Sequence, residues 1–529
     1  MNDAPENGNS SVTRPASKVM FGGILSLLGG LVSNVVIAAV FGAKADMDAY
    51  LTALVIPTYV QLVFYSSLSF VLVPAFIEAE AKKEEDDAWT LVGTFFWLTL
   101  IILLGLSVVC SLFSAQIISL TAPGFQEDKA KLASQMLAVL MFTTPFIGLG
   151  TLTAGIQNAR RRFFWPSVAP AFGAFGNMIA LLSLYPVIDS MALAWGFFTS
   201  TVIQAGFTIL PLVFHGWKKI FPITDHRVVG VMKLMVPLIL IGMLTSFTPV
   251  AERYFSSGLQ DGQISYMGYV SKISSVFVVL LASGIATSIY PAMARAYAEG
   301  GVEALAEKNS FGLRLSFAVA IPSIMIVSAI AVPLISVLFE RGAFEHADTI
   351  GVSLIIFPFL LKDVFFRMVA NVFQRSFYVL KAPTSQLTIA AVFLIVYMAT
   401  AGFFVDQWGY VGLVWAGAIK RALASLAVWI LLSRRLPKTQ QWNIVPYFLK
   451  YCCAASAAYI CGRSIVLAMA SVPAVFQMAV GGLIGSLLYL LVLYFIDREI
   501  FRSILDLSGV RFFVALFQNG GKSFSPKRS

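Results

Sequence analysis

About fourteen apolar segments, each longer than 20 residues, divide this chain of 529 residues. They lie at roughly 19–41, 49–77, 89–117, 133–157, 167–187, 190–214, 229–256, 264–294, 311–339, 349–378, 384–404, 409–433, 446–470 and 474–496. A helix needs about 20 apolar residues to cross the hydrocarbon core of a membrane. Hydrophobic residues make up 58% of the chain and charged residues 12%, which excludes a water-soluble globule. We therefore predict an all-α polytopic membrane protein with about fourteen transmembrane helices.

Matching landmarks recur along the chain at a nearly constant offset. The pairs and their separations are Gly42 and Gly258 (216), Pro74 and Pro291 (217), Gly124 and Gly342 (218), Pro166 and Pro383 (217), and Trp195 and Trp415 (220). Self-similarity at a fixed offset indicates an internal repeat, and two hydrophobic repeats in one chain are typical of transporters. The repeat predicts five parts, namely a disordered tail at 1–18, an N-lobe at 19–215 with helices 1–6, a C-lobe at 228–435 with helices 7–12, helices 13–14 at 446–496, and a tail at 497–529.

Basic residues cluster in alternate connections between the predicted helices, as in Arg160, Arg161 and Arg162. By the positive-inside rule, this pattern places both termini in the cytoplasm. Both repeats then start on the same side of the membrane, so the two lobes are parallel. The net charge of +10 follows from this topology, and it requires no nucleic-acid partner.

The polar chemistry of the chain is sparse. Its four cysteines fall in predicted membrane helices and its three histidines occur singly, so we expect neither disulfides nor a metal site, and no cofactor. The connections are too short to hold a folded domain outside the membrane. This absence weighs against a catalytic protein.

Several short motifs resemble those of the MviN/MurJ family. They are Val40-Phe41-Gly42-Ala43, Asp48-Ala49-Tyr50, Ile56-Pro57, Val73-Pro74-Ala75, Thr121-Ala122-Pro123-Gly124-Phe125, Glu252-Arg253-Tyr254-Phe255, Tyr269-Val270-Ser271-Lys272 and Leu338-Phe339-Glu340-Arg341-Gly342-Ala343-Phe344. The resemblance covers about residues 20–435. It implies the fold of the multidrug/oligosaccharidyl-lipid/polysaccharide exporters, with two six-helix lobes around a central cavity. It also implies transport of a lipid-linked saccharide, with helices 13 and 14 holding the lipid tail.

The chain departs from the family at positions that carry charge in the lipid II flippases. It has the uncharged Ser33-Asn34 in helix 1 and Val60-Gln61-Leu62 in helix 2. In helix 8 it has Ser271-Lys272, of which only the lysine is charged. The acidic residue of the first corner is kept as Asp48. These departures predict a different head group, and weak or no rescue of a cell that is depleted of its lipid II flippase.

Charged residues inside the predicted helices are concentrated in the second lobe. An ionisable group in the membrane costs a few kcal/mol on insertion scales, so it faces a cavity or a charged partner. We predict a substrate-binding cavity that is lined by Lys272, Arg253, Glu252, Asn34, Asp48, Gln61, Lys362, Asp363, Arg367, Lys420 and Arg421. Lys272 has the strongest claim, because its position matches a cavity cation of the family. Asp363 and Arg367 are spaced i, i+4, so an internal salt bridge explains that pair as well as substrate binding does.

We therefore favour a flippase that moves an undecaprenyl-pyrophosphate-linked saccharide from the inner to the outer leaflet of the bacterial cytoplasmic membrane. Lipid II and a precursor of a surface polysaccharide both fit, with membrane lipids and the polysaccharide or cell-wall synthesis machinery as partners. Cations that line the cavity would bind the anionic diphosphate through charge-assisted hydrogen bonds. Transport could be coupled to the membrane potential, protons or sodium. The alternatives are a multidrug antiporter of the same superfamily, a membrane enzyme acting on lipid-linked sugars, and a non-transporting scaffold.

Overall fold

The structure is a computed structural model that describes residues 10–81, 85–214, 217, 227–381, 384–437 and 444–507. Within these ranges every regular element is a helix, which confirms the all-α prediction. The first helix begins at Ser10, so only residues 1–9 of the predicted N-terminal tail lie outside the described chain. The predicted C-terminal tail lies outside it from residue 508 onward.

Twelve described helices are long and apolar enough to cross a membrane. Two of these spans, Phe164–Phe214 and Thr388–Ser433, have 51 and 46 residues, which is enough for two crossings each. Each is interrupted near its centre, the first by the 3₁₀ turn η2 (Asp189–Met191) and the second by a kink at Gly409. The predicted number of fourteen helices depends on counting these halves separately, and it stays a prediction.

The contacts divide the chain into two compact units. Unit 1 comprises Met1–Lys272, Phe339–Gly351 and Ala390–Ala416, and unit 2 comprises Ile273–Leu338, Val352–Ile389 and Gly417–Ser529. The elements up to Lys272 are α1 (Ser10–Phe41), α2 (Ala45–Ala53), α3 (Val55–Val60), η1 (Gln61–Tyr65), α4 (Ser66–Ala81), α5 (Glu85–Leu112), α6 (Ser114–Thr121), α7 (Glu127–Met141), α8 (Thr143–Ala159), α9 (Phe164–Ile188), η2, α10 (Ala192–Phe214), α11 (Arg227–Thr245), α12 (Thr248–Ser256) and the first part of α13 (Gln263–Phe277).

The elements after α13 are η3 (Val278–Ala282), α14 (Ser283–Ala329), α15 (Ala331–Phe339), α16 (His346–Leu360), η4 (Leu361–Phe365), α17 (Phe366–Val379), α18 (Thr384–Ser433), α20 (Ile444–Ala468), α21 (Ala474–Ile496) and α22 (Arg498–Leu507). The chain passes from one unit to the other within α13, α15, α16 and α18. The lobe boundaries that the repeat predicts are a separate division of the chain, and they remain a prediction.

Irregular backbone recurs at the offset that the sequence landmarks predict. The π-helical segments η1 and η3 both have five residues and start 217 positions apart. Asp189, with φ 48° and ψ −129°, and Gly409, with φ 56° and ψ −140°, lie 220 positions apart. Positive φ is uncommon outside glycine, so a chance match of such positions is improbable. The two halves therefore repeat in backbone detail as well as in hydropathy.

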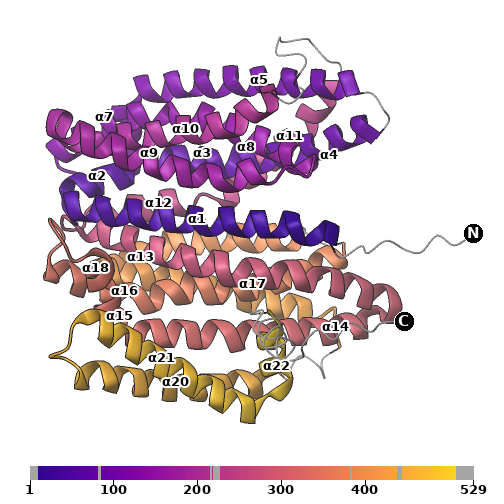
Figure 1. The fold of residues 1–529 in the computed structure, drawn as a ribbon, viewed down its shortest axis with the longest axis vertical. Coiled ribbons are helices and arrows are strands. Elements are labelled where there is room, and N and C mark those ends of the chain that lie inside the picture. Colours follow the sequence, from indigo (N-terminus) through magenta and orange to yellow (C-terminus); the bar gives the residue numbers. More distant parts are fainter. Residues whose placement is uncertain are drawn as a thin grey trace, which may run out of the picture. The chain divides into compact units, whose positions relative to one another are not determined.

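In unit 1, glycines let α1 pack closely on α9. A side chain at Gly22 would collide with Ser167, and one at Gly29 would touch Ala171, whereas Gly23 and Gly30 face open space. Figure 1 shows the two helices running side by side. Small residues permit such close packing between membrane helices. Packing therefore accounts for two of the glycines of the first helix.

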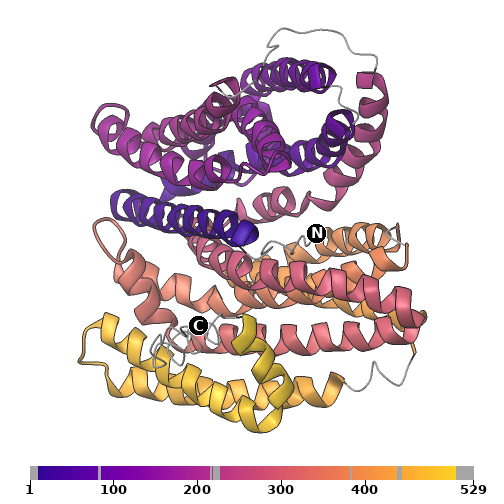
Figure 2. The same cartoon turned by 45° about the vertical axis from the view of Figure 1, so that its right-hand side comes forward.

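In unit 2, the hairpin of α20 and α21 packs along α14, as Figure 2 shows at the yellow end of the chain. The buried carboxylate of Asp497 anchors the end of the hairpin. It accepts hydrogen bonds from Arg314 Nη2 at 2.6 Å and from the Tyr451 hydroxyl at 2.7 Å. It also caps α22, because Ile500 N donates to its Oδ1 at 3.2 Å. This network fixes the added pair of helices to the second repeat.

Candidate functional site

Two glycines in the left-handed region lie where α1 ends and where α15 is followed by a turn. Gly42 has φ +60° and Gly342 has φ +62°. A side chain on Gly42 would collide with the carbonyl of Ala343, and one on Gly342 with the carbonyl of Ala39. Ala343 N donates a hydrogen bond to Ala39 O at 2.8 Å. Both the positive φ and the close backbone approach therefore require glycine here.

The corresponding segments of the two repeats also meet, with the repeats exchanged. Gly124 N donates to Ser257 Oγ at 3.0 Å, and a side chain on Gly124 would collide with the backbone of Gly258. Gly258 corresponds to Gly42, and Gly124 corresponds to Gly342, at offsets of 216 and 218. The corner at Gly42 thus packs on the loop at Gly342, and the corner at Gly258 packs on the loop at Gly124. All of these residues belong to unit 1.

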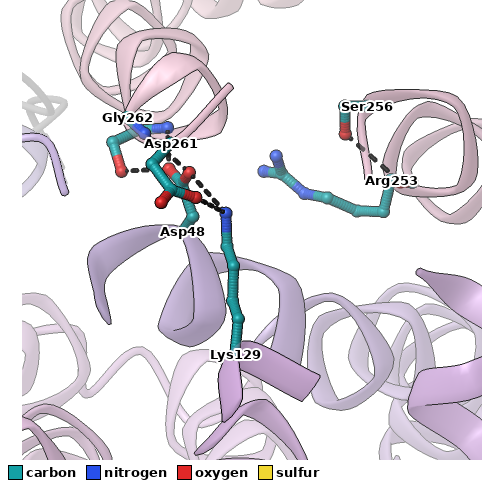
Figure 3. Close-up of polar contacts among 7 residues, drawn as sticks. Asp48, Lys129, Arg253, Ser256, Asp261 and Gly262 are labelled. Carbon is teal, nitrogen blue, oxygen red and sulfur yellow. Dashed lines mark hydrogen bonds and ion pairs between the residues drawn. The ribbon is translucent and has the colours of Figure 1, made fainter. Parts of the chain in front are cut away.

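A buried carboxylate lies at the centre of this region (Figure 3). Asp48 is completely buried. It accepts hydrogen bonds from Gly262 N at 2.8 Å, Ser265 N at 2.8 Å, Ser265 Oγ at 2.5 Å and Lys129 Nζ at 3.0 Å. Lys129 Nζ also contacts Asp261 Oδ1 at 2.8 Å. We call these five residues the Asp48 cluster; its carboxylate is fully satisfied, as a buried charge requires.

Glu252 and Arg253 are adjacent charged residues of α12, and both are partly buried. Figure 3 shows Arg253 pointing toward Asp48 and Lys129. Among the described residues, Arg253 Nη1 is buried with no hydrogen-bond partner. The structure therefore places the predicted Arg253 beside Asp48 without a direct bond between them.

Three further predicted cavity residues of unit 1 lie on α1, η1 and α13. Asn34 Nδ2 donates to Gly30 O of its own helix at 2.6 Å. Gln61 is exposed at the first position of η1, and Lys272 is exposed on α13. The Asp48 cluster therefore includes only one of the residues that the sequence analysis placed in the cavity, and Arg253 borders it.

The first repeat also contains a neutral cavity of about 640 Å³. It lies among α4, α8, α9 and α10, and its polar lining includes Thr151, Asn158, Gln204 and Thr208. No lining residue is charged. A cavity of this kind offers hydrogen bonds but no countercharge to an anion.

The intramembrane charges of unit 2 form a second group. Asp363 Oδ1 lies 3.3 Å from Arg421 Nη2 and 3.7 Å from Arg367 Nη2. We call these three residues the Asp363 cluster. The side chains of Arg367 and Arg421 are 43% and 37% exposed, whereas that of Asp363 is 16% exposed. The predicted i, i+4 pair is thus present, and Arg421 joins it from α18.

Two predicted lysines flank the Asp363 cluster in sequence. Lys362 is buried, with Nζ 4.1 Å from the centre of the Phe359 ring, which gives a cation–π contact. Its stem lies against Gly417, where a side chain would collide with it. Lys420 is half-buried on α18. Lys362 is therefore held by packing and by the Phe359 ring, and its predicted place in the cavity stays a prediction.

Comparison with known proteins settles the family. A sequence model described as the lipid II flippase MurJ matches residues 37–481. The chain belongs to this family. It is 28% identical to a probable lipid II flippase MurJ of Vibrio cholerae serotype O1, over 74% of the chain and 77% of the relative. It is 25% identical to the lipid II flippase MurJ of Burkholderia cenocepacia, over 78% and 82%.

Solved structures agree with this assignment at the level of the fold. A lipid II flippase MurJ in an inward closed conformation matches with a TM-score of 0.77 and 21% identity, over 91% of the chain and 99% of that structure. An inward-facing multidrug transporter of the MATE family matches with a TM-score of 0.65 and 14% identity, over 78% and 94%. The predicted fold class, an all-α polytopic membrane protein, is thereby confirmed.

Membership of the MurJ family makes the protein a multi-pass membrane transporter and excludes the alternative of a membrane enzyme. The multidrug antiporter is the weaker alternative, because the family model and the curated relatives are all described as lipid II flippases. The roles of the individual site residues stay predictions.

Sequence reasoning missed two partners of Asp48. Neither Lys129 nor Ser265 is among the residues that the sequence predicts for the cavity. The repeat could have found Ser265, because it lies 217 positions after Asp48, within the range of the landmark offsets. The corresponding residues of the two repeats thus bond to each other. No comparable signal in the sequence connects Lys129 with Asp48.

Proposed function

We propose that this MurJ-family protein moves lipid II from the inner to the outer leaflet of the bacterial cytoplasmic membrane. The observation that carries the proposal is the family match over residues 37–481, together with curated relatives that are named lipid II flippases. Lipid II is an undecaprenyl-pyrophosphate-linked saccharide, so the protein would serve peptidoglycan synthesis and pass its substrate to the cell-wall machinery.

The Asp48 cluster would close the outer side of the transport path. With cytoplasmic termini, the corners after α1 and α12 face outward, and it is there that the two repeats bond to each other. Release of the head group requires these contacts to separate. Because Lys129 bridges Asp48 and Asp261, its two ion pairs would break and re-form in each cycle.

The driving force would come at least in part from the membrane potential. Moving one charge across 100 mV is worth about 2.3 kcal/mol. A substrate diphosphate is anionic, so an inside-negative potential favours its outward movement. Proton or sodium coupling remains a further proposal, to be tested by ion gradients imposed on proteoliposomes.

A lipid-linked unit of a surface polysaccharide is the second candidate. Ser33, Asn34 and Gln61 favour it, because they stand where the resemblance implies charged residues in the lipid II flippases. In the structure Ser33 is buried and accepts a hydrogen bond from Asn177 Nδ2 at 3.0 Å. The names of the curated relatives support lipid II, and the substituted positions make the choice testable.

Rescue of a bacterium depleted of its lipid II flippase tests the proposal. We expect growth and outward lipid II transport at native expression, against the weak rescue that the sequence departures alone predict. Asp48→Asn is tested beside the wild type, because it keeps the shape of the side chain and removes the charge. The abundance of each protein in the membrane is measured in the same cells. A wild-type protein that reaches the membrane at full abundance and restores no lipid II transport would overturn lipid II as the substrate.

A further inference from the structure

We propose that Arg367 and Arg421 bind the diphosphate of the lipid-linked substrate near the middle of the membrane, with Asp363 as their counter-ion when the site is empty. This inference rests on the proposed function. It assigns the anion site to the second repeat, whereas the resemblance implies family cations in the first two helices.

Both helices place the Asp363 cluster near mid-depth. Asp363 lies 17 residues after the start and 16 before the end of the span His346–Val379. Arg421 lies 12 residues after the kink at Gly409 and 12 before the end of the span at Ser433. At 1.5 Å per residue, either arginine is about 18 Å or more from the end of its helix. The surrounding bilayer would therefore be hydrocarbon on any face open to lipid.

The exposure of the arginines indicates a water-filled face. Arg367 and Arg421 keep 43% and 37% of their side chains exposed. An arginine in contact with lipid tails at this depth is costly, so ionisable groups there face a cavity or a partner. One carboxylate cannot neutralise two guanidinium groups. The exposed part of each arginine is thus available to an anion that enters through water.

The hydrogen-bonding capacity of the cluster exceeds what Asp363 uses. Each guanidinium carries five N–H donors in a planar fork that matches phosphate geometry. Asp363 Oδ1 lies 3.3 Å from one arginine and 3.7 Å from the other, which are long distances for charge-assisted hydrogen bonds. In the described part of the chain, Arg367 Nε is also buried without a hydrogen-bond partner. A diphosphate could bind the exposed donors of the two guanidinium groups without breaking a short bond.

The backbone at this point is irregular in a way that is common at functional sites. Asp363 lies in the π-helical segment η4, and Arg367 follows it in α17. π-Helical segments occur mostly as single turns, frequently at binding or catalytic sites. Here the segment lies between two regular helices of one membrane span. It places Asp363 and Arg367 on the side that Arg421 approaches.

The first repeat has no corresponding charges. Subtracting 220, the offset that relates Asp189 to Gly409 and Trp195 to Trp415, takes Arg421 to Thr201. Offsets of 218 to 220 take Asp363 to positions 143–145 and Arg367 to positions 147–149, where every residue is uncharged. A charge group needed only for helix packing would have no reason to be confined to one of two similar repeats. The asymmetry fits a ligand that is bound by one repeat.

Binding of undecaprenyl pyrophosphate to the purified full chain in nanodiscs tests the inference, with undecaprenol as the uncharged probe. The decisive variant is Arg367→Gln/Arg421→Gln/Asp363→Asn, which replaces the whole Asp363 cluster with neutral side chains. Its net charge falls by one. Arg434→Gln, an exposed residue just after α18, is the matched control because it lowers the net charge equally.

We expect the triple variant to bind undecaprenyl pyrophosphate at least tenfold more weakly and undecaprenol unchanged, with the control like the wild type. Asp363→Asn alone should bind the diphosphate as tightly as the wild type or more tightly. Arg421→Lys should weaken it several-fold, because lysine keeps the charge but lacks the planar fork.

The outcomes separate the two proposals. A wild-type protein that binds undecaprenyl pyrophosphate no better than undecaprenol contradicts the proposed function. If the wild type prefers the diphosphate and the triple variant keeps that preference, the Arg367–Arg421 site is wrong while the proposed function stands. If the triple variant does not accumulate, Arg421→Lys decides, and unchanged affinity in that variant overturns the site.

Discussion

The Asp48 cluster has two carboxylates and one basic side chain, whereas the Asp363 cluster has one carboxylate and two basic side chains. Asp48 is completely buried and accepts four hydrogen bonds of 2.5 to 3.0 Å, two of them from backbone N–H groups. Asp363 has its two arginines at 3.3 and 3.7 Å, and both remain partly exposed. The carboxylate of Asp48 thus has all of its hydrogen bonds, whereas the two arginines of the Asp363 cluster have more donors than its one carboxylate accepts.

This difference separates a structural closure from a binding site. Removing a buried, saturated charge leaves all of its partners unpaired, at a cost of about 3–5 kcal/mol. Partly exposed pairs contribute about 0–1 kcal/mol, because water competes for them. We therefore expect substitutions at Asp48 to change stability and substitutions in the Asp363 cluster to change substrate binding.

Asp48→Ala should have the largest effect. It removes the acceptor of two backbone N–H groups, the Ser265 hydroxyl and Lys129, and should destabilise the protein by about 3–5 kcal/mol. Thermal unfolding of the purified protein in detergent measures the effect. Asp261→Asn is the control, because its carboxylate is 65% exposed and bonds only to Lys129 among the described contacts. Equal unfolding temperatures for Asp48→Ala and the wild type would show that the cluster does not hold the corner.

Lys272→Met should abolish transport and leave stability almost unchanged. Lys272 is exposed on α13, nine residues after its start at Gln263, which is about 14 Å along the helix. Methionine keeps the apolar stem and removes the charge. Lys272→Arg, which keeps the charge, should retain part of the activity. Normal lipid II transport by the methionine variant would mean that the lysine reaches the membrane interface and serves only packing.

Lys129→Met should have an intermediate effect on stability. It removes the ion pairs with Asp48 and Asp261, but Gly262 N and both donors of Ser265 remain on Asp48. We expect a loss of about 1–3 kcal/mol, the cost of taking a charged partner from a buried acceptor. Lys131→Met, on the same helix, is the matched control. A loss as large as that of Asp48→Ala would show that the lysine, and not the backbone donors, holds the carboxylate.

The sequence predicted the fold further than it predicted the site. Hydropathy identified the apolar helices, and the repeat predicted the offset at which irregular backbone recurs, because both patterns are set by period and spacing along the chain. It also selected Asp48, Asp363, Arg367 and Arg421 as intramembrane or corner charges. It did not find that Lys129 bonds to Asp48, since the two residues are 81 positions apart and belong to different helices. Contacts of this kind depend on how helices pack, which no local pattern encodes.

Asp363→Asn should have the smallest effect on stability, within about 1 kcal/mol, because its ion pairs with Arg367 and Arg421 are long and both arginines are partly exposed to water. The variant removes the counter-ion and leaves both arginines in place. If the arginines serve only to neutralise Asp363, the variant leaves two uncompensated charges at mid-depth and should lose several kcal/mol on the same thermal assay. If they face water and await an anion, unfolding should hardly change and added undecaprenyl pyrophosphate should stabilise the variant more than the wild type, since no internal carboxylate competes. A large loss of stability without ligand, matching that of Asp48→Ala, would make the two clusters alike and remove the distinction between closure and binding site.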